Sequence, residues 1–340
     1  MNQYFVSIIC PIYNEEKYIV QCIESILAQK YPLGEMELLF IDGRSTDNTR
    51  DIISDYQSKY SLIKLLDNPN KIVPHALNIG IREAQGNVII RVDGHCVYPH
   101  NYISTLVKYL FELHADNVGA VWNTLPANDS AKCRSIAIAS SHRFGVGNSK
   151  YKIGAKEIIE TDTVPFGCYR RDIFEQIGFF DEKLIRNQDD EFNGRIIKHG
   201  GKIFLIPSLI IEYYARDTLK KINKMYYQYG LFKPLANKKL GKPATIRQFV
   251  PALFLSSLLL GAMLSFFSPG LMIIYLSIIA AYLIAGIAIG IQKAKQQKDY
   301  KLMYHLPFTF FVIHISYGWG YWVGIYKVIC KQNIIVKDNR

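Results

Sequence analysis

The chain has 340 residues, of which 49% are hydrophobic, and a formal net charge of +11. The positive charge lies in the C-terminal third: residues 217–340 hold 16 Lys and Arg and three acids, giving +13, whereas residues 1–216 hold 24 basic and 26 acidic residues, giving −2. A basic excess beside long apolar runs is typical of a protein at an anionic membrane surface and argues against a nucleic-acid groove.

The cysteines are scattered through the chain and none forms a CxxC pair. This spacing argues against a zinc site or a disulfide framework and favours a reducing, cytoplasmic setting. The N-terminus has no basic region followed by a long apolar stretch, so the apolar run at 5–10 predicts a first strand and not a signal peptide.

Strands and helices alternate through the first hundred residues. Further strands are predicted at 37–41 and 62–66 and within 87–95, and helices carry apolar faces at 19–27, 52–56 and 73–84. Ser45 or Thr46 is expected to cap the second of these helices. This alternation predicts a parallel sheet with right-handed crossovers, which binds ligands at the carboxyl ends of its strands. No GxGxxG or Walker loop is present, so a dinucleotide dehydrogenase or a P-loop enzyme is disfavoured.

The stretch 87–95 is a short run of β-branched residues that ends in Asp93-Gly94-His95. Asp93 and His95 are two residues apart, so in an extended segment both side chains point to the same side. Together they could hold Mg²⁺ or Mn²⁺ against a diphosphate. An Asp-Gly pair after a strand is also a common turn, and this interpretation stays open on spacing alone.

The pattern loosens after residue 101. A helix is predicted near 101–114, a strand at 119–122, a loop from 140 to 152, and two short strands at 203–206 and 209–214. Asn187-Gln188-Asp189-Asp190-Glu191 opens a helix that stops at Gly200-Gly201. The two aspartates are either a catalytic pair or simply acids that favour a helix N-terminus.

The C-terminal third carries the apolar segments. Residues 219–232 predict an amphipathic helix, either lying on a membrane or packed on the protein's own core. Residues 248–267 and 270–291 are each about 20 residues long without a charge, enough to cross a hydrocarbon core. Their outer flanks are basic, which predicts a hairpin with the N-terminal domain in the cytoplasm. A third segment, about 303–326, either spans the membrane or lies in its interface.

Four motifs occur in order and at suitable distances: Pro11-Ile12-Tyr13-Asn14-Glu15, Ile41-Asp42-Gly43-Arg44-Ser45-Thr46-Asp47, Asp93-Gly94-His95 and Gln188-Asp189-Asp190-Glu191. Over residues 4–235 the chain resembles the family 2 glycosyltransferases with a GT-A fold, an α/β fold with a mostly parallel sheet flanked by helices. It looks most like the succinoglycan-biosynthesis branch, whose members extend lipid-linked sugars during bacterial exopolysaccharide assembly.

The resemblance implies roles for particular residues. Asp93, with His95 as a second ligand, would hold the divalent ion, although the family usually has a second Asp where His95 stands. Asp42 would bind the nucleotide base, Pro11, Tyr13 and Glu15 would shape the same pocket, and Lys71 would neutralise a phosphate or be a solvated loop lysine. Asp189 matches the family's general base, with Asp190 as the alternative.

The sequence therefore predicts a cytoplasmic glycosyltransferase domain at 1–216, a basic juxtamembrane segment at 217–247 and a multi-pass region of the inner (plasma) membrane at 248–340. The expected reaction is inverting transfer from a nucleotide sugar, a UDP-sugar first of all, to a polyprenyl-linked saccharide, with Mg²⁺ or Mn²⁺ as cofactor. The rivals are transfer to polyprenyl phosphate itself and a membrane-anchored nucleotide-sugar-binding protein without catalysis.

Overall fold

A computed structural model describes residues 4–243 and 245–334, and it divides into two compact units. Of the described residues, the first unit comprises those up to Asn123 together with Gly154–Tyr213, and the second comprises Thr124–Ile153 together with those from Tyr214 onward. The predicted transferase domain of 1–216 thus contains a segment, 124–153, that the structure groups with the C-terminal helices.

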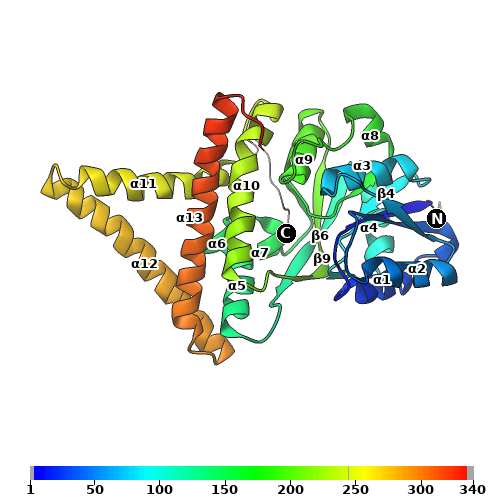
Figure 1. The fold of residues 1–340 in the computed structure, drawn as a ribbon, viewed down its shortest axis with the longest axis horizontal. Helices are drawn as coiled ribbons and strands as arrows, with labels where there is room; N and C mark the ends of the chain where they lie inside the picture. Colours follow the sequence, from blue (N-terminus) through cyan, green and yellow to red (C-terminus); the bar gives the residue numbers. More distant parts are fainter. Residues whose placement is uncertain (1–3, 244, 335–340) are drawn as a thin grey trace. The chain divides into compact units, whose positions relative to one another are not determined.

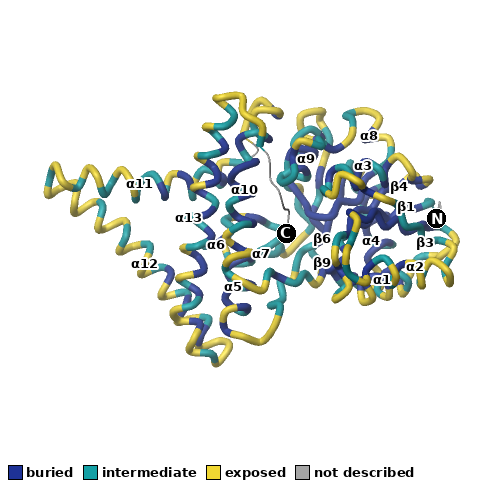
Figure 2. The backbone as a smooth tube through the Cα atoms, in the orientation of Figure 1, coloured by how far each residue is buried: buried dark blue, intermediate teal, exposed yellow. Residues whose placement is uncertain are grey.

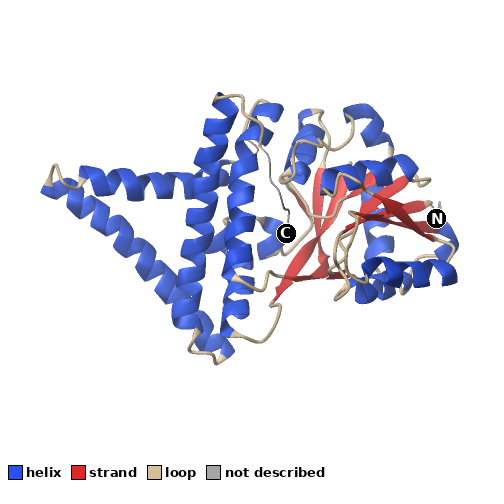
Figure 3. Ribbon diagram, in the orientation of Figure 1, coloured by secondary structure: helices blue, strands red, loops and turns tan. Residues whose placement is uncertain are grey.

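The described residues form a nine-stranded sheet (Figure 3). Its order is β3-β2-β1-β4-β8-β6-β9-β5, with β7 paired to β9. The strands are β1 Val6–Ile12, β2 Met36–Asp42, β3 Ile63–Asp67, β4 Val88–Arg91, β5 Cys96–Val97, β6 Asn117–Leu125, β7 Ile159–Glu160, β8 Cys168–Arg170 and β9 Ile203–Tyr214.

Strands β3, β2, β1 and β4 run parallel, as predicted. Every residue of β1, β2 and β4 is buried, because parallel strands are covered by helices on both faces. The register aligns Ile12 with Asp42 and Asp42 with Asp67, so these strands end at one common edge. The loops that begin at Tyr13, Gly43 and Val92 consequently start at that same edge.

The remaining pairings that the register gives are antiparallel: β8 with β4 and β6, and β9 with β5 and β7. The helices of this unit are α1 Ile19–Leu27, η1 Leu33–Glu35, α2 Thr49–Lys59, α3 Val73–Glu83, α4 Tyr102–Glu112, α8 Asp172–Ile177 and α9 Gln188–Lys198. Apolar residues of β1, β2, β4, α1 and α4 make one buried cluster, which forms the core beneath the strand ends.

Three local expectations are wrong. Residues 203–214 are one strand, because the fixed φ of Pro207 suits extended backbone even though it removes a donor. The expected loop at 140–152 contains the end of α5 and the short helices α6 Arg143–Val146 and α7 Lys150–Ile153. Neither Ser45 nor Thr46 caps α2, whose N-cap is Asn48, because both hydroxyls bond elsewhere in the site.

The second unit is helical (Figure 1). Beyond α6 and α7 it contains α5 Ala131–Ser141, α10 Leu219–Leu240, η2 Ile246–Phe249, α11 Val250–Leu264, α12 Pro269–Gln297 and α13 Leu302–Ile329. Helices α10 and α13 lie side by side, and a Cβ on Gly320 would stand 2.1 Å from the carbonyl oxygen of Tyr227. The apolar face of α10 is therefore buried against α13 within the protein, the second of the two alternatives for this helix.

Helices α11 and α12 leave the α10–α13 pair and converge at their far ends (Figure 1). Within the described residues, two helical segments are long and apolar enough to cross a membrane, Ile246–Leu264 and Pro269–Gln297. Only 17% and 6% of the apolar windows in these two segments are buried, and α12 is mostly exposed (Figure 2), which is unlike the core helices of a soluble protein. The predicted segments 248–267 and 270–291 thus correspond to one exposed apolar hairpin.

Candidate active site

The loops that follow β1 and β2 are tied together by side-chain hydrogen bonds. Asn14 adopts a left-handed backbone with φ of 54° and donates its N–H to the Ser45 hydroxyl at 2.9 Å. The Asn14 side-chain oxygen accepts from the Thr46 N–H at 2.8 Å, and the Glu15 N–H donates to the Thr49 hydroxyl at 2.7 Å. These contacts fix the direction in which Glu15 leaves β1.

Asp42 is the last residue of β2, and its side chain has no exposed surface. Its carboxylate accepts hydrogen bonds from the Ser45 N–H at 3.1 Å and the Ser45 hydroxyl at 2.6 Å, and it pairs with Arg50. In this structure Asp42 organises the 42–47 loop. Contact with a nucleotide base, which the resemblance implies, stays a prediction.

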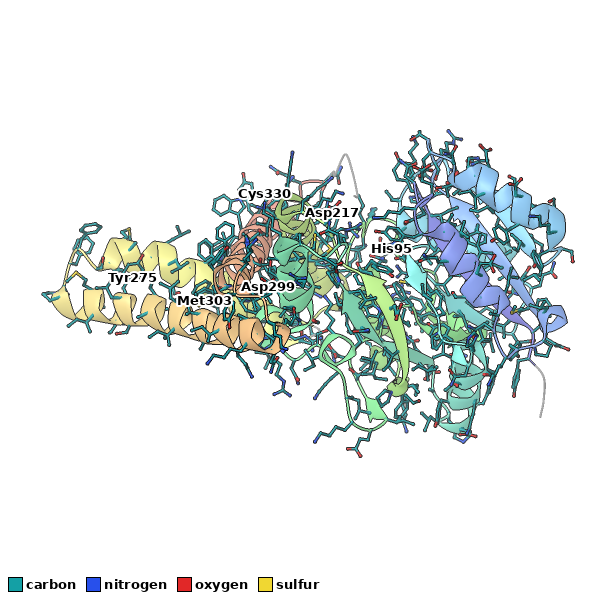
Figure 4. All side chains as sticks on the ribbon, turned by 90° about the horizontal axis from the view of Figure 1, so that it is seen from below. His95, Asp217, Tyr275, Asp299, Met303 and Cys330 are labelled. Atoms are coloured by element: carbon teal, nitrogen blue, oxygen red, sulfur yellow. The ribbon has the colours of Figure 1, made fainter. Side chains whose placement is uncertain are left out.

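Glu15, Asp93 and His95 form a compact cluster at the common strand edge, and Figure 4 labels His95. One ligand atom of each lies within 4.8 Å of the others. The Nδ1 atom of His95 stands 3.1 Å from Asp93 Oδ1 and 3.2 Å from Glu15 Oε1. Asp93 and His95 point to the same side as predicted, but they do so across a turn, in which the Cys96 N–H donates to the Asp93 carbonyl at 3.3 Å, and not along an extended segment. Glu15 is a third member, which the sequence had assigned to the nucleotide pocket.

Gly94 permits this cluster because its backbone lies against the first loop. A Cβ at this position would stand 3.1 Å from Ile12 Cγ2 and 3.2 Å from Glu15 Cγ, tighter than ordinary side-chain contacts. A larger residue would therefore push Glu15 away from Asp93. The Asp-Gly pair does lie in a turn, the alternative that its spacing left open, and this turn also brings two carboxylates and an imidazole together.

The two carboxylates dominate the electrostatics of His95. Burial by itself would lower the pKa of His95, but Asp93 and Glu15 outweigh it and raise the pKa to about 9. The Nε2 atom of His95 is buried and has no hydrogen-bond partner among the described residues. Two carboxylate oxygens and an imidazole nitrogen fit a divalent ion, and they suit Mn²⁺ better than Mg²⁺ because Mg²⁺ prefers oxygen ligands.

Asp189 reaches the same edge from the first turn of α9. It forms an ion pair with Arg91, the last residue of β4 and two residues before Asp93. Burial raises the pKa of the Asp189 carboxyl, and Arg91 opposes that rise. The structure thus brings the predicted base and the predicted metal ligand together, with an arginine that sequence reasoning did not assign.

The neighbours of Asp189 on α9 have different surroundings. Glu191 is buried and bonded to Arg195 at 2.8 Å, and Arg195 also donates to the carbonyl oxygens of Ile177, Gly178 and Phe179. Arg195 therefore holds the loop before α9 in place. Asp190 is half-buried and adds to the rise in the pKa of Asp189.

The other predicted pocket residues surround this edge. Pro11 lies within β1 and is buried, and the Cβ of Tyr13 lies next to Gly43. Lys71 has a left-handed backbone with φ of 60°, and its Cα also borders Gly43, while its side chain is exposed. These positions put all three residues around the strand ends. Their contacts with a ligand remain predictions.

An aromatic group beside the cluster was also missed. Trp122 stacks on Tyr213 with ring centroids 4.2 Å apart, Tyr213 lies 5.4 Å from the His95 ring, and Arg91 lies over the Phe166 ring. These residues come from β6, β9 and the loop before β8, far apart in sequence. No local pattern could have revealed their meeting.

Comparison with known proteins agrees with this geometry. The pattern described as Glycosyl transferase family 2 matches residues 7–178, 172 of the 340 residues. A dolichyl N-acetyl-alpha-D-glucosaminyl phosphate 3-beta-D-2,3-diacetamido-2,3-dideoxy-beta-D-glucuronosyltransferase from Methanococcus voltae is 32% identical over 332 residues, 95% of this chain and 98% of its own. The succinoglycan biosynthesis protein ExoA of Rhizobium meliloti is 29% identical over 260 residues, 76% of this chain and 77% of its own.

Solved structures show the same fold. Mannosyltransferase PcManGT from Pyrobaculum calidifontis, in complex with GDP-Man and Mn²⁺, has a TM-score of 0.57 at 18% identity and covers 94% of this chain and 88% of its own. S. aureus TarS 1–349 with UDP-GlcNAc has a TM-score of 0.52 at 16% identity, covering 96% and 92%. The chain belongs to the family 2 glycosyltransferases and has the GT-A transferase fold.

Proposed function

We propose that this glycosyltransferase moves a sugar, with inversion, from a UDP-sugar to a saccharide carried on a polyprenyl lipid during cell-surface polysaccharide synthesis. The observation that carries the proposal is the ion pair between Asp189 and Arg91, two residues from Asp93. Through this ion pair the carboxylate of Asp189, which suits an acceptor hydroxyl, lies at the same edge of the sheet as Glu15, Asp93 and His95, which suit a diphosphate-bound ion.

The donor half of the site consists of Glu15, Asp93 and His95. A divalent ion held there, Mn²⁺ or Mg²⁺, would offset the negative charge that grows on the departing nucleotide diphosphate. Asp42, Pro11, Tyr13 and Lys71 surround the same edge and would bind the nucleotide. The Mn²⁺ complex of the Pyrobaculum relative supports this assignment through the shared fold.

The acceptor half depends on Asp189. An inverting transfer needs a base that takes the proton from the acceptor hydroxyl on the side opposite the leaving group. Burial raises the pKa of Asp189, which makes its carboxylate a stronger base, and Arg91 fixes where that carboxylate points. Glu191 cannot take this part because Arg195 binds both of its oxygens.

The lipid carrier is supported by the relatives and by the apolar hairpin. The Methanococcus relative is named for a dolichyl-linked N-acetylglucosaminyl phosphate acceptor, and its match extends over nearly the whole chain. The hairpin of α11 and α12 offers two exposed apolar helices that would hold the enzyme at the membrane containing such a lipid. Lys293 and Lys295 near its end and Arg247 near its start favour a cytoplasmic catalytic domain.

A transfer assay on purified protein tests the proposal. UDP-sugars are supplied with either polyprenyl phosphate or a polyprenyl-diphosphate-linked monosaccharide, and both nucleotide release and lipid product are measured. We expect product on the saccharide acceptor and an axial-to-equatorial change at the transferred anomeric carbon. Product formed only on polyprenyl phosphate would show that the acceptor is polyprenyl phosphate and not a lipid-linked saccharide. Binding of a UDP-sugar without any turnover would show that the protein is not catalytic.

The base is tested by Asp189→Asn, with Asp190→Asn as the matched control one residue away. Loss of the base should lower kcat by about 10²–10⁴-fold while donor KM changes little, because the donor is held by other residues. The Asp190 variant should keep most of its activity. Loss of activity in the Asp190 variant alone would move the base by one residue.

A further inference from the structure

The third apolar segment, α13, has two possible relations to a lipid bilayer, and its packing distinguishes them. It is one helix of 28 residues, about 42 Å long at 1.5 Å per residue, so its length alone would allow it to span. No charged side chain occurs between Leu302 and Tyr326. What decides its placement is the helix beside it.

Helix α10 lies along α13 in the same direction and at backbone contact. Tyr227 meets Gly320, and Leu231 meets Gly324, so the two helices run parallel. A Cβ on Gly324 would stand 2.4 Å from the carbonyl oxygen of Leu231, and one on Gly230 would stand 2.1 Å from that of Tyr317. Helices this close cannot separate without losing their packing, so α10 and α13 share one placement relative to the membrane.

Helix α10 cannot cross a membrane. It carries six lysines within 22 residues, at positions 220, 221, 224, 233, 238 and 239. A lysine at the centre of a bilayer costs about 2.5–3.5 kcal/mol even on the mildest scale. Because α10 must stay outside the hydrocarbon along its length, α13 cannot pass through it either.

The side of α13 that faces away from α10 is nonetheless apolar. Exposed residues form one stripe, opposite Gly320 and Gly324 on the helix, with a spacing of three or four positions except for a gap of eight between Phe311 and Trp319: Tyr304, Phe308, Phe311, Trp319, Trp322, Tyr326 and Ile329. Two of them are tryptophan and two are tyrosine, the residues that concentrate at membrane interfaces. Lysines flank the stripe at both ends, at Lys298 and Lys301 and at Lys327 and Lys331.

The stripe is also continuous with the apolar hairpin. The Trp322 indole N–H donates to the Ala252 carbonyl of α11 at 3.2 Å, and Tyr282 of α12 bonds His314 at 2.8 Å. Figure 4 shows Met303 at the base of the hairpin and Tyr275 near its far end. If α11 and α12 enter a membrane, the exposed stripe of α13 therefore lies at the surface of that membrane.

We propose that α13 lies flat in the interface of the anionic leaflet, between α10 and the lipid, and that only the α11–α12 hairpin penetrates deeply. The inference rests on the membrane attachment proposed above. Aromatic side chains would enter the headgroup and acyl boundary by about 5–10 Å, and the flanking lysines would contact anionic headgroups. The chain after α13 then stays on the side of the membrane from which the hairpin enters.

Depth measurements on the full-length protein test this placement. Single cysteines at Tyr304, Phe311, Trp319 and Tyr326 receive a spin label in a Cys330→Ser background, because Cys330 is the exposed cysteine of the described residues. The protein is reconstituted in vesicles of phosphatidylethanolamine and phosphatidylglycerol, and accessibility to oxygen and to a water-soluble nickel chelate is compared. Labels at Ile273, Ile278, Ile284 and Ile291 on α12 form the matched series.

We expect one shallow depth for all four α13 labels and a steady change of depth along α12. Deep labels at Phe311 and Trp319 between shallow ones at Tyr304 and Tyr326 would mean that α13 spans, and would overturn the inference while leaving the hairpin intact. Low accessibility to both reagents along the stripe would mean that protein, such as a second copy, covers it, which also overturns it. Water-exposed α12 labels would remove the membrane attachment itself.

Discussion

At the scale of single residues, the cluster of Glu15, Asp93 and His95 leads to a binding prediction. Asp93→Ala or Glu15→Gln should lower the Mn²⁺-dependent affinity for UDP by at least about tenfold. Mutating a residue that only hydrogen-bonds to a metal ligand already lowers metal affinity by about tenfold or more, and a ligand should matter at least as much. Titration calorimetry with UDP, with and without Mn²⁺, measures it.

Glu16→Gln is the control, because the adjacent carboxylate bonds Asn48 and stands outside the cluster. An equal loss of UDP affinity in Glu16→Gln would show that the ion binds elsewhere. So would an unchanged affinity in both Asp93→Ala and Glu15→Gln.

Arg91 gives a second prediction, on the pH dependence of transfer. Burial raises the pKa of Asp189, Arg91 lowers it, and Asp190 and Asp93 raise it further, with Tyr169 also nearby. A positive charge favours the carboxylate, so Arg91→Met should raise the pKa of Asp189. Since protonated Asp189 accepts no proton, the acid limb of the kcat profile should move to higher pH.

The control is Lys108→Met, which removes a positive charge on α4 that is paired with Glu112. That variant should keep the acid limb of the wild-type protein. An Arg91 variant that loses activity equally at every pH would indicate that Arg91 only supports the fold. Rescue of the profile by Arg91→Lys would indicate that the charge matters more than the guanidinium shape.

At the scale of elements, the sequence could predict those helices and strands that local residue patterns determine, but not those that depend on contacts with distant residues. The first four strands and three helices were predicted within a few residues, because buried parallel strands and amphipathic helices leave periodic patterns. The short helix α6 was missed because its support comes from distant residues. Phe144 packs on Phe310, more than 160 positions later.

The same distinction applies to the site. Asp93 and His95 lie in one compact motif at a strand end, so their proximity could be expected from the sequence, whereas Asp189 was assigned through the family resemblance alone. Arg91 could not be assigned in advance, because its partner lies 98 residues away. The direction of Glu15 likewise depends on bonds to Thr49 and on the absence of a Cβ at Gly94.

The contact between α10 and α13 leads to a prediction about packing. Gly320→Ala would place a methyl group 2.1 Å from the Tyr227 carbonyl and should destabilise the helical unit by about 1–3 kcal/mol, as overpacking usually does. Thermal unfolding followed by helical circular dichroism in detergent measures it.

Gly270→Ala is the matched control, since the nearest atom to its added methyl is the Ser268 hydroxyl at 3.6 Å. Equal melting temperatures for the two variants would contradict the close approach of the helices.

At the scale of the whole molecule, the second unit is assembled from two separated stretches of chain. Helix α5 belongs to it: Arg134 pairs with Asp299 at 2.8 Å, Ser135 bonds Thr309 at 2.9 Å, and Ile136 and Ala139 share a buried cluster with Phe310. A truncation after Arg216 should therefore aggregate, because it leaves the apolar face of α5 without its partners.

The corresponding control replaces residues 124–153 of that truncation with a short Gly/Ser linker. This protein should stay in the supernatant after centrifugation, whereas the simple truncation should pellet. Equal solubility of the two would mean that α5 does not require the C-terminal helices.

The ion pair between Arg134 and Asp299 joins residues 165 positions apart. During synthesis the ribosome releases α5 long before α13 exists, and the α11–α12 hairpin is made in between. At the usual pace of roughly 5–20 residues per second, α5 waits on the order of ten seconds for its partners. Completion of the second unit therefore follows the synthesis of the α11–α12 hairpin in time, and until then the apolar face of α5 lacks its partners Thr309 and Phe310.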